Sequence, residues 1–118
     1  MPGIESRDFH SPDETRTPDK TTVELVNLAG GQIGRYTFEP GWRWSECIRP
    51  VVNTESCQVE HIGYVVSGAL HIKHEDGSEA DLMPGEVYRI AAGHDAWNAG
   101  QEPAVFVEFQ GAANYARG

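Results

Sequence analysis

Glycine and proline interrupt this sequence about every ten residues, and these breaks constrain the fold more than any other feature. Between the breaks, apolar and polar side chains alternate, as in strands that face a core on one side and solvent on the other. No window of ten or more residues has the periodicity of a helix. We therefore predict an all-β fold. The nine predicted strands cover residues 23–28, 32–39, 42–48, 57–66, 69–74, 78–82, 86–91, 94–98 and 104–110.

The composition excludes several classes of function. The chain has 118 residues, enough for one domain. Eighteen acidic residues against nine basic residues give a net charge of −9, which disfavours binding to nucleic acid or to an anionic membrane surface. The sequence has neither the roughly 18-residue apolar run of a membrane span nor the apolar core of a secretory signal. We expect a cytoplasmic protein without nucleic-acid or membrane partners.

Residues 1–20 differ from the rest of the chain. They contain three prolines and scattered charges, with few large apolar side chains. We interpret them as an extended arm that packs over a neighbour or stays mobile, and residues 21–118 as a single barrel domain. Because such an arm can cover an edge strand of a second copy, we expect a homodimer.

Residues 61–97 read HIGYVVSGALHIKHEDGSEADLMPGEVYRIAAGHDAW and resemble the central part of a cupin. Gly68 matches the last glycine of the first cupin motif, and Gly85 and Gly93 match the two glycines of the second. The resemblance covers residues 23–110 and implies a double-stranded β-helix, or jelly-roll barrel, that is open at one end. Cupins include dioxygenases, isomerases, lyases, storage proteins and sensor domains, so the resemblance does not specify the chemistry.

The chain also resembles a narrower group of small single-domain cupins. It shares with them the segment EPGWRWSE at residues 39–46, the spacing of Cys57 and His61, and the segment GHDAW at residues 93–97. It departs from the group at Cys47, where histidine is usual. This narrower resemblance supports the fold rather than a particular reaction.

The resemblance implies where metal ligands would lie. A metal-dependent cupin places three histidines and one glutamate inside the barrel. At three of those four ligand positions, this chain has Cys47, His61 and Ala96. The usual ligand set is therefore absent, and dioxygenase chemistry with iron or manganese is not supported. Other donors are available, because Cys57 lies on the same predicted strand face as His61 and His94 has the parity of Ala96.

A non-standard site made of Cys47, Cys57, His61 and His94 would offer two thiolates and two imidazoles. This set favours zinc, while iron, manganese and nickel stay compatible with it. Without a metal, the histidines would be core side chains and the cysteines small buried hydrophobes. The two cysteines could instead form a disulfide if their Cα atoms lie within about 7 Å of each other.

Aromatic residues near these positions indicate a ligand pocket. Trp42, Trp44 and Glu46 share one face of the predicted strand 42–48, where the indoles could stack on a planar ligand and the carboxylate could anchor it. Tyr64 and Trp97 are further candidates for the pocket wall. The alternative for all the aromatic residues is packing in the barrel core or at a dimer interface.

Three functions remain open from the sequence. The first is a metal-binding cupin that acts on or binds a small organic molecule. The second is a metal-free module that binds or senses a small ligand without catalysis. The third is a thiol-redox protein that uses Cys47 and Cys57.

Overall fold

The computed structural model describes residues 3–110, so the last part of the predicted domain, residues 111–118, lies outside the described residues. The described residues form nine strands and two short helices. In chain order these are β1 (Glu14–Arg16), β2 (Thr21–Leu28), β3 (Gly31–Phe38), α1 (Trp44–Cys47), α2 (Arg49–Val52), β4 (His61–Ser67), β5 (Leu70–His74), β6 (Glu79–Leu82), β7 (Val87–Ile90), β8 (His94–Trp97) and β9 (Ala104–Gln110).

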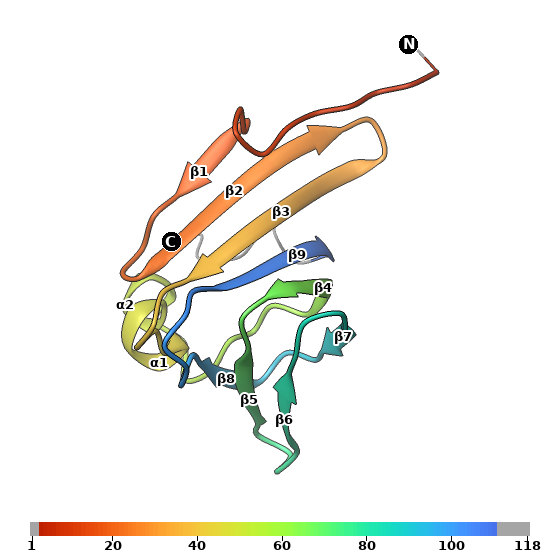
Figure 1. Ribbon diagram of the computed structural model, residues 1–118. Helices are drawn as coiled ribbons and strands as arrows, with labels where there is room; N and C mark the ends of the chain where they lie inside the picture. The colour runs from red at the N-terminus through yellow and green to blue at the C-terminus, as the bar shows by residue number, and fades with distance from the viewer. Residues whose placement is uncertain (1–2, 111–118) are drawn as a thin grey trace.

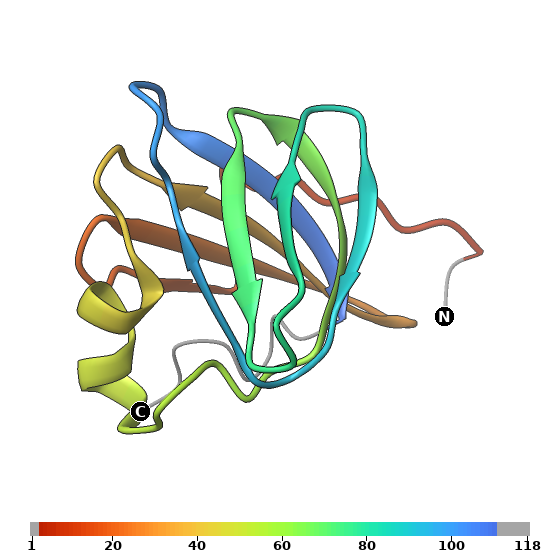
Figure 2. The same cartoon turned by 90° about the horizontal axis from the view of Figure 1, so that it is seen from below.

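The strands form two antiparallel sheets that face each other (Figure 1). The larger sheet has the order β1-β2-β3-β9-β4-β7, and the smaller sheet has the order β6-β5-β8. Figure 2 shows the same two layers from below, with the helices together at one end. The all-β jelly-roll prediction is confirmed, and eight of its nine predicted strands correspond to strands of the structure.

The core fills the space between the two sheets. Alternation along β2 buries Val23 and Leu25 completely, as a strand with one face on the core requires. Phe38 makes edge-on contact with Tyr36 and Phe106, at ring-centroid distances of 5.8 and 6.0 Å, which adds to the stabilisation from burial. The smaller sheet contributes the buried residues Leu70, Ile72 and Ala96.

The prediction of a strand over residues 42–48 is wrong. Residues Trp44–Cys47 form helix α1, and Arg49–Val52 form α2 directly after it. Trp44, Cys47 and Ile48 are all buried, and this i, i+3, i+4 spacing places them on one face of a helix. None of the helices in the described part of the chain is long and apolar enough to span a membrane.

The segment before α1 is tied to the end of β8. The carbonyl of Trp42 accepts a hydrogen bond from the backbone N–H of Asn98 at 2.9 Å. The buried side-chain amide of Asn98 donates to the carbonyls of Phe38 and Glu102, at 3.1 and 2.9 Å. These bonds satisfy backbone groups where strands end, and they hold Trp42 over one end of the barrel.

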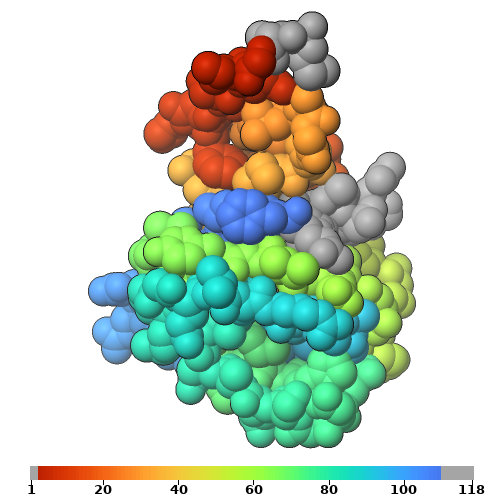
Figure 3. All heavy atoms as spheres, turned by 90° about the vertical axis from the view of Figure 1, so that its right-hand side faces the viewer, coloured from red at the N-terminus to blue at the C-terminus, as the bar shows by residue number. Residues whose placement is uncertain are grey.

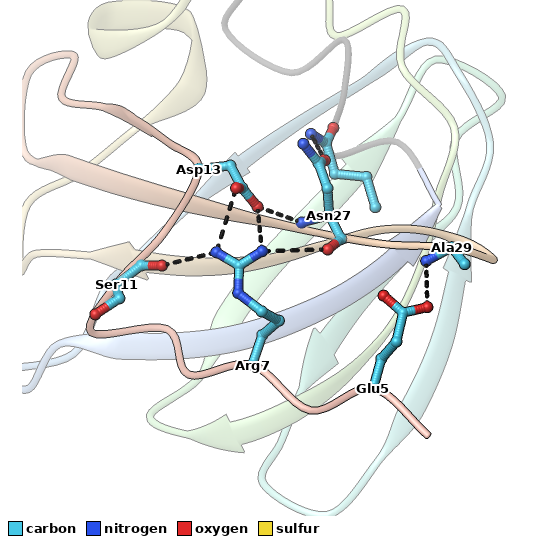
Figure 4. Close-up of polar contacts among 7 residues, drawn as sticks. Glu5, Arg7, Ser11, Asp13, Asn27 and Ala29 are labelled. Atoms are coloured by element: carbon cyan, nitrogen blue, oxygen red, sulfur yellow. Dashed lines mark hydrogen bonds and ion pairs between the residues drawn. The ribbon is translucent and has the colours of Figure 1, made fainter. Parts of the chain in front are cut away.

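The N-terminal arm lies along β2 of its own chain. Strand β1 pairs with β2, which makes it the edge strand of the larger sheet. Arg7 donates to both carboxylate oxygens of Asp13, at 3.1 and 3.2 Å, and Asp13 accepts from the backbone N–H of Asn27 at 2.7 Å (Figure 4). The carboxylate of Glu5 accepts from the backbone N–H of Ala29 at 3.0 Å. Within residues 3–16 the arm therefore packs on the larger sheet of the same chain.

Candidate metal and ligand site

Three of the four predicted metal ligands come together inside the barrel. One ligand atom each of Cys57, His61 and His94 lie within 4.8 Å of one another. The three residues are 2–4% exposed, so the cluster is shielded from bulk water. Among the described residues, this is the group of histidine, cysteine and carboxylate side chains whose arrangement could hold a metal ion.

Backbone hydrogen bonds bring Cys57 beside His94. Cys57 lies before β4 and forms an isolated bridge with His94, in which its N–H donates to the His94 carbonyl at 2.8 Å. The N–H of Gly93 donates to the Cys57 carbonyl at 2.7 Å. Gly93 has a φ of +96°, and a Cβ on it would lie 2.9 Å from a carboxylate oxygen of Glu75. This tight turn therefore depends on glycine.

A buried carboxylate orients His61. The Nδ1 atom of His61 donates to Glu108 at 2.5 Å, and the hydroxyl of Tyr88 donates to the other oxygen of Glu108 at 2.5 Å. Gly63 makes room for this arrangement, because a Cβ there would lie 2.6 Å from the Tyr88 hydroxyl. With Nδ1 bound to the carboxylate, Nε2 is the nitrogen that faces the Cys57 sulfur, 3.6 Å away.

A backbone carbonyl orients His94 in the same way. Nδ1 of His94 lies 2.8 Å from the carbonyl oxygen of Ala91. A carbonyl oxygen can only accept, so Nδ1 carries the proton and the neutral ring has its lone pair on Nε2. Both histidines thus have their outer nitrogens fixed by acceptors, which is the usual support for metal-bound imidazoles.

Contacts within the cluster and with Glu108 shift the pKa values of Cys57 and His61. Burial raises the pKa of the Cys57 thiol, but contacts with His61 and His94 lower it more, and the pKa is about 6. Burial lowers the pKa of His61, but the negative charges of Glu108 and Cys57 raise it more, to about 10. Without a metal, a thiolate therefore faces an imidazolium. Metal binding at such a site would release the Nε2 proton.

Cys47 does not join the cluster. It lies on helix α1, where its buried thiol is 3.7 Å from a carboxylate oxygen of Asp19. Burial raises the pKa of Cys47, the opposite of the net change at Cys57. Both cysteines are free thiols. The predicted four-ligand set is therefore reduced to three, because the predicted strand that placed Cys47 beside the others is a helix.

A small cavity of about 30 Å³ adjoins the cluster. His61, His94 and Glu108 supply the imidazole and carboxylate groups of its lining. Of the predicted pocket residues, Trp42 and Trp44 line it, and both are buried. The remaining wall is largely apolar and aromatic: Tyr36, Phe38, Leu70, Ile72, Tyr88, Ile90, Ala96 and Phe106.

The other three predicted pocket residues, Glu46, Tyr64 and Trp97, do not line this cavity. Glu46 is exposed because α1 turns it away from the buried helix face. Tyr64 has the opposite strand parity to His61 and points outward. Trp97 likewise has the opposite parity to His94 and lies on the outer face of β8.

Trp97 belongs to a surface stack instead. The guanidinium of Arg43 lies 4.2 Å from its ring centroid, and the ring of His71 lies 4.7 Å from it. His71 is bonded through Nδ1 to Asp81 and through Nε2 to Glu79, each at 2.8 Å. The hydrogen bonds with Glu79 and then Asp81 raise the pKa of His71 above its ordinary value.

We expect His71 to titrate above 6.5, its ordinary value. A histidine whose pKa is raised on folding stabilises the fold most fully below its unfolded-state pKa, and this contribution is lost as the pH rises through the folded-state pKa. A titration of the His71 ring signals by NMR measures the folded value. The double variant Glu79→Gln/Asp81→Asn should bring it back toward 6.5, and an unchanged midpoint would contradict the assigned cause.

The sequence interpretation missed Glu108 and Tyr88. Both lie on strands that were predicted, and a signal for Glu108 exists in β9, where Ala104 and Phe106 share its parity and are buried. A carboxylate on the buried face of a strand needs a partner. A buried tyrosine hydroxyl also needs a partner, but no local pattern in the sequence identifies Glu108 as the partner of Tyr88.

Comparisons with known proteins agree with the geometry. The family model described as "Cupin domain" matches residues 34–109. No functionally curated protein is similar enough to match the sequence. Among solved structures, a protein of unknown function from Rhizobium leguminosarum bv. viciae 3841 is 20% identical with a TM-score of 0.64, covering 89% of this chain and 93% of its own.

Two similar structures carry functional names. A sugar phosphate isomerase from a cupin superfamily, from Silicibacter pomeroyi, is 21% identical with a TM-score of 0.62, over 88% of this chain and 73% of its own. An ectoine synthase from P. lautus is 12% identical with a TM-score of 0.63, over 89% and 77%. At these identities the similarity concerns the fold. Since the family model spans most of β3 through most of β9 and thus all three residues of the cluster, the chain belongs to the cupin family.

Proposed function

We propose that this cupin holds a divalent metal ion through Cys57, His61 and His94 and binds a small organic molecule in the adjoining cavity. The observation that carries the proposal is the buried cluster itself, with three ligand atoms within 4.8 Å of one another. One thiolate and two imidazoles favour zinc over magnesium, calcium or manganese. Three protein ligands are also the number found in catalytic zinc sites, which keep one position for water or substrate.

The surrounding residues fit such a site. Glu108 and the Ala91 carbonyl each hold the Nδ1 of one histidine, which leaves the Nε2 atoms for coordination. Cys57 would bind as a thiolate. A zinc ion there would act as a Lewis acid toward an oxygen of the bound molecule. The aromatic walls exclude water and orient the ligand.

Metal analysis tests the proposal. Protein purified without a metal-affinity tag and dialysed against zinc should contain about one equivalent by elemental analysis, because three preoriented donors bind zinc tightly. His61→Ala should lose this equivalent, since it removes one donor and the ring whose Nδ1 links Glu108 to the cluster. Circular dichroism confirms that each variant is folded.

Two variants serve as matched controls. His71→Ala removes a histidine of the outer sheet face, and Cys47→Ser removes a buried thiol outside the cluster. Both should keep the full equivalent of zinc. Metal retained in His61→Ala, or wild-type protein that binds no zinc, would refute the metal site.

A second candidate uses the same residues without a metal. Cys57, His61 and Glu108 form a continuous chain of contacts, at 3.6 Å from sulfur to Nε2 and 2.5 Å from Nδ1 to carboxylate. A thiol beside a histidine that is oriented by a carboxylate is the usual arrangement of a cysteine nucleophile. Metal-free protein that reacts with iodoacetamide at Cys57 and not at Cys47 would favour this candidate.

We also propose that the chain forms a homodimer through the outer face of β4, β7 and β9. These strands lie side by side on one side of the molecule (Figure 3). Five large apolar side chains are exposed on them: Ile62, Tyr64, Val66, Val87 and Phe109. An apolar patch of this kind favours a partner surface. Two copies of a chain with a net charge of −9 repel each other. A second copy can approach at this largely apolar face, where the exposed charge of Arg89 is paired with that of Glu60 at 3.1 Å.

Sedimentation velocity tests this assembly. The wild type should sediment as a dimer, and Val87→Glu should shift it to monomer, because the acid would be buried against the partner without a counter-charge. Met83→Glu is the matched control, since Met83 is also exposed but is not on these strands. A wild-type monomer, or a Val87→Glu dimer, would contradict the proposal.

A further inference from the structure

The size of the cavity limits what the site can hold. Its volume of about 30 Å³ is several times smaller than the roughly 150 Å³ that accommodates a benzene ring. It exceeds the roughly 10–15 Å³ needed for one water molecule. The enclosed part therefore takes a group of a few non-hydrogen atoms.

The charges around the cavity disfavour an anion. No lysine or arginine lines it among the residues that the structure describes, and the carboxylate of Glu108 does. With a divalent ion held by the Cys57 thiolate, the two positive charges are balanced by the thiolate and by Glu108. The whole chain adds a net charge of −9, so the long-range field also repels anions.

One hydrogen-bond donor of the cavity wall lacks an acceptor. Trp42 lines the cavity, is 2% exposed, and its indole N–H is buried with no hydrogen-bond partner in the described part of the chain. A buried donor without an acceptor costs free energy, and most such groups in folded proteins are satisfied. A ligand oxygen in the cavity would satisfy it.

We infer that the ligand of this site is a small uncharged molecule with a carbonyl or hydroxyl oxygen on a short apolar body. The oxygen accepts from the Trp42 indole, and the apolar body contacts the aromatic wall. This inference rests on the proposed function in that it names the class of molecule for the same cavity. It separates that class from phosphorylated and carboxylated compounds, which need a net positive charge: the described wall has no lysine or arginine, and the positive charge of His61 is offset by Glu108.

Acetone and acetate form a matched pair of probes, since both have four non-hydrogen atoms in nearly the same planar shape and differ in charge. We expect acetone to bind the zinc-loaded protein at least tenfold more tightly than acetate, with a dissociation constant in about the millimolar range for so small a ligand. Titrations followed by ¹H–¹⁵N spectra should shift the indole signal of Trp42 and leave that of Trp97 in place. Equal or tighter binding of acetate, or no binding of acetone up to about 100 mM, overturns the inference.

Variants test the role of the indole. Trp42→Phe should weaken acetone binding about five- to tenfold, the loss expected for one hydrogen bond, while Trp97→Phe, outside the cavity, should leave it unchanged. If Trp42→Phe does not fold, the shift of the Trp42 indole signal in the wild type still tests whether the ligand contacts this indole. Metal content is measured on the same samples. Absent zinc with preserved acetone selectivity refutes the metal site alone, whereas bound zinc with a preference for acetate refutes the ligand class alone.

Discussion

Replacing Gly68 by alanine should lower the free energy of unfolding by about 3–4 kcal/mol. Gly68 has a φ of +70°, which costs a residue with a Cβ about 1–2 kcal/mol. The new Cβ would also lie 2.5 Å from the carbonyl oxygen of Pro103 and 2.6 Å from the Cα of Ala104. Backbone atoms cannot rotate away as a flexible side chain can, so the β4–β5 turn and the start of β9 must separate.

Gly85→Ala isolates the backbone contribution. Gly85 has a similar positive φ of +91°, but nothing lies within 4 Å of the position where its Cβ would be. We expect a loss of about 1–2 kcal/mol for this variant. Urea unfolding monitored by tryptophan fluorescence measures both. Equal losses for the two variants would show that the close approach of Pro103 and Ala104 contributes nothing.

The turns and strands of this fold could be predicted because each depends on a local signal. Gly68 and Gly93 stand where the backbone needs a positive φ, and a glycine at such a place is visible in the sequence. The exception is the segment 42–48, where WRWSECI alternates well enough to indicate a strand. Its buried residues Trp44, Cys47 and Ile48 have helical spacing, but one helical turn is too short for that spacing to prevail over alternation.

The candidate site was only partly predictable, since its residues meet through tertiary contacts. The shared parity of Cys57 and His61 indicated that they face the same side, and the structure places them together. His94 reaches them through a backbone bridge to Cys57 that no local pattern reveals. Cys47 stands in register with a ligand position of the first cupin motif, but it lies on helix α1, away from the cluster. Tyr64 could have been excluded from the pocket by the same alternation that placed His61 inside.

Glu108→Gln should affect both the metal site and the fold. The neutral amide removes the charge that orients His61, and it disturbs the bond from Tyr88. Loss of such a supporting carboxylate lowers metal affinity about 10- to 100-fold. Removing one partner of a buried ion pair typically costs about 3–5 kcal/mol. We expect the metal-free protein to lose about 3 kcal/mol of unfolding free energy, at the low end of that range, because His61 can release its proton.

Glu24→Gln is the matched control for this prediction. Glu24 also pairs with a cation, Arg35, at 2.9 Å, but both side chains are partly exposed and lie on the outer face of the larger sheet. Such a pair contributes at most about 1 kcal/mol, and zinc affinity should not change. Competition with a chelator measures zinc affinity, and urea unfolding measures stability. If Glu108→Gln binds zinc as tightly as Glu24→Gln does, the carboxylate does not position His61 for a metal, and its role is limited to the buried hydrogen bonds of the core.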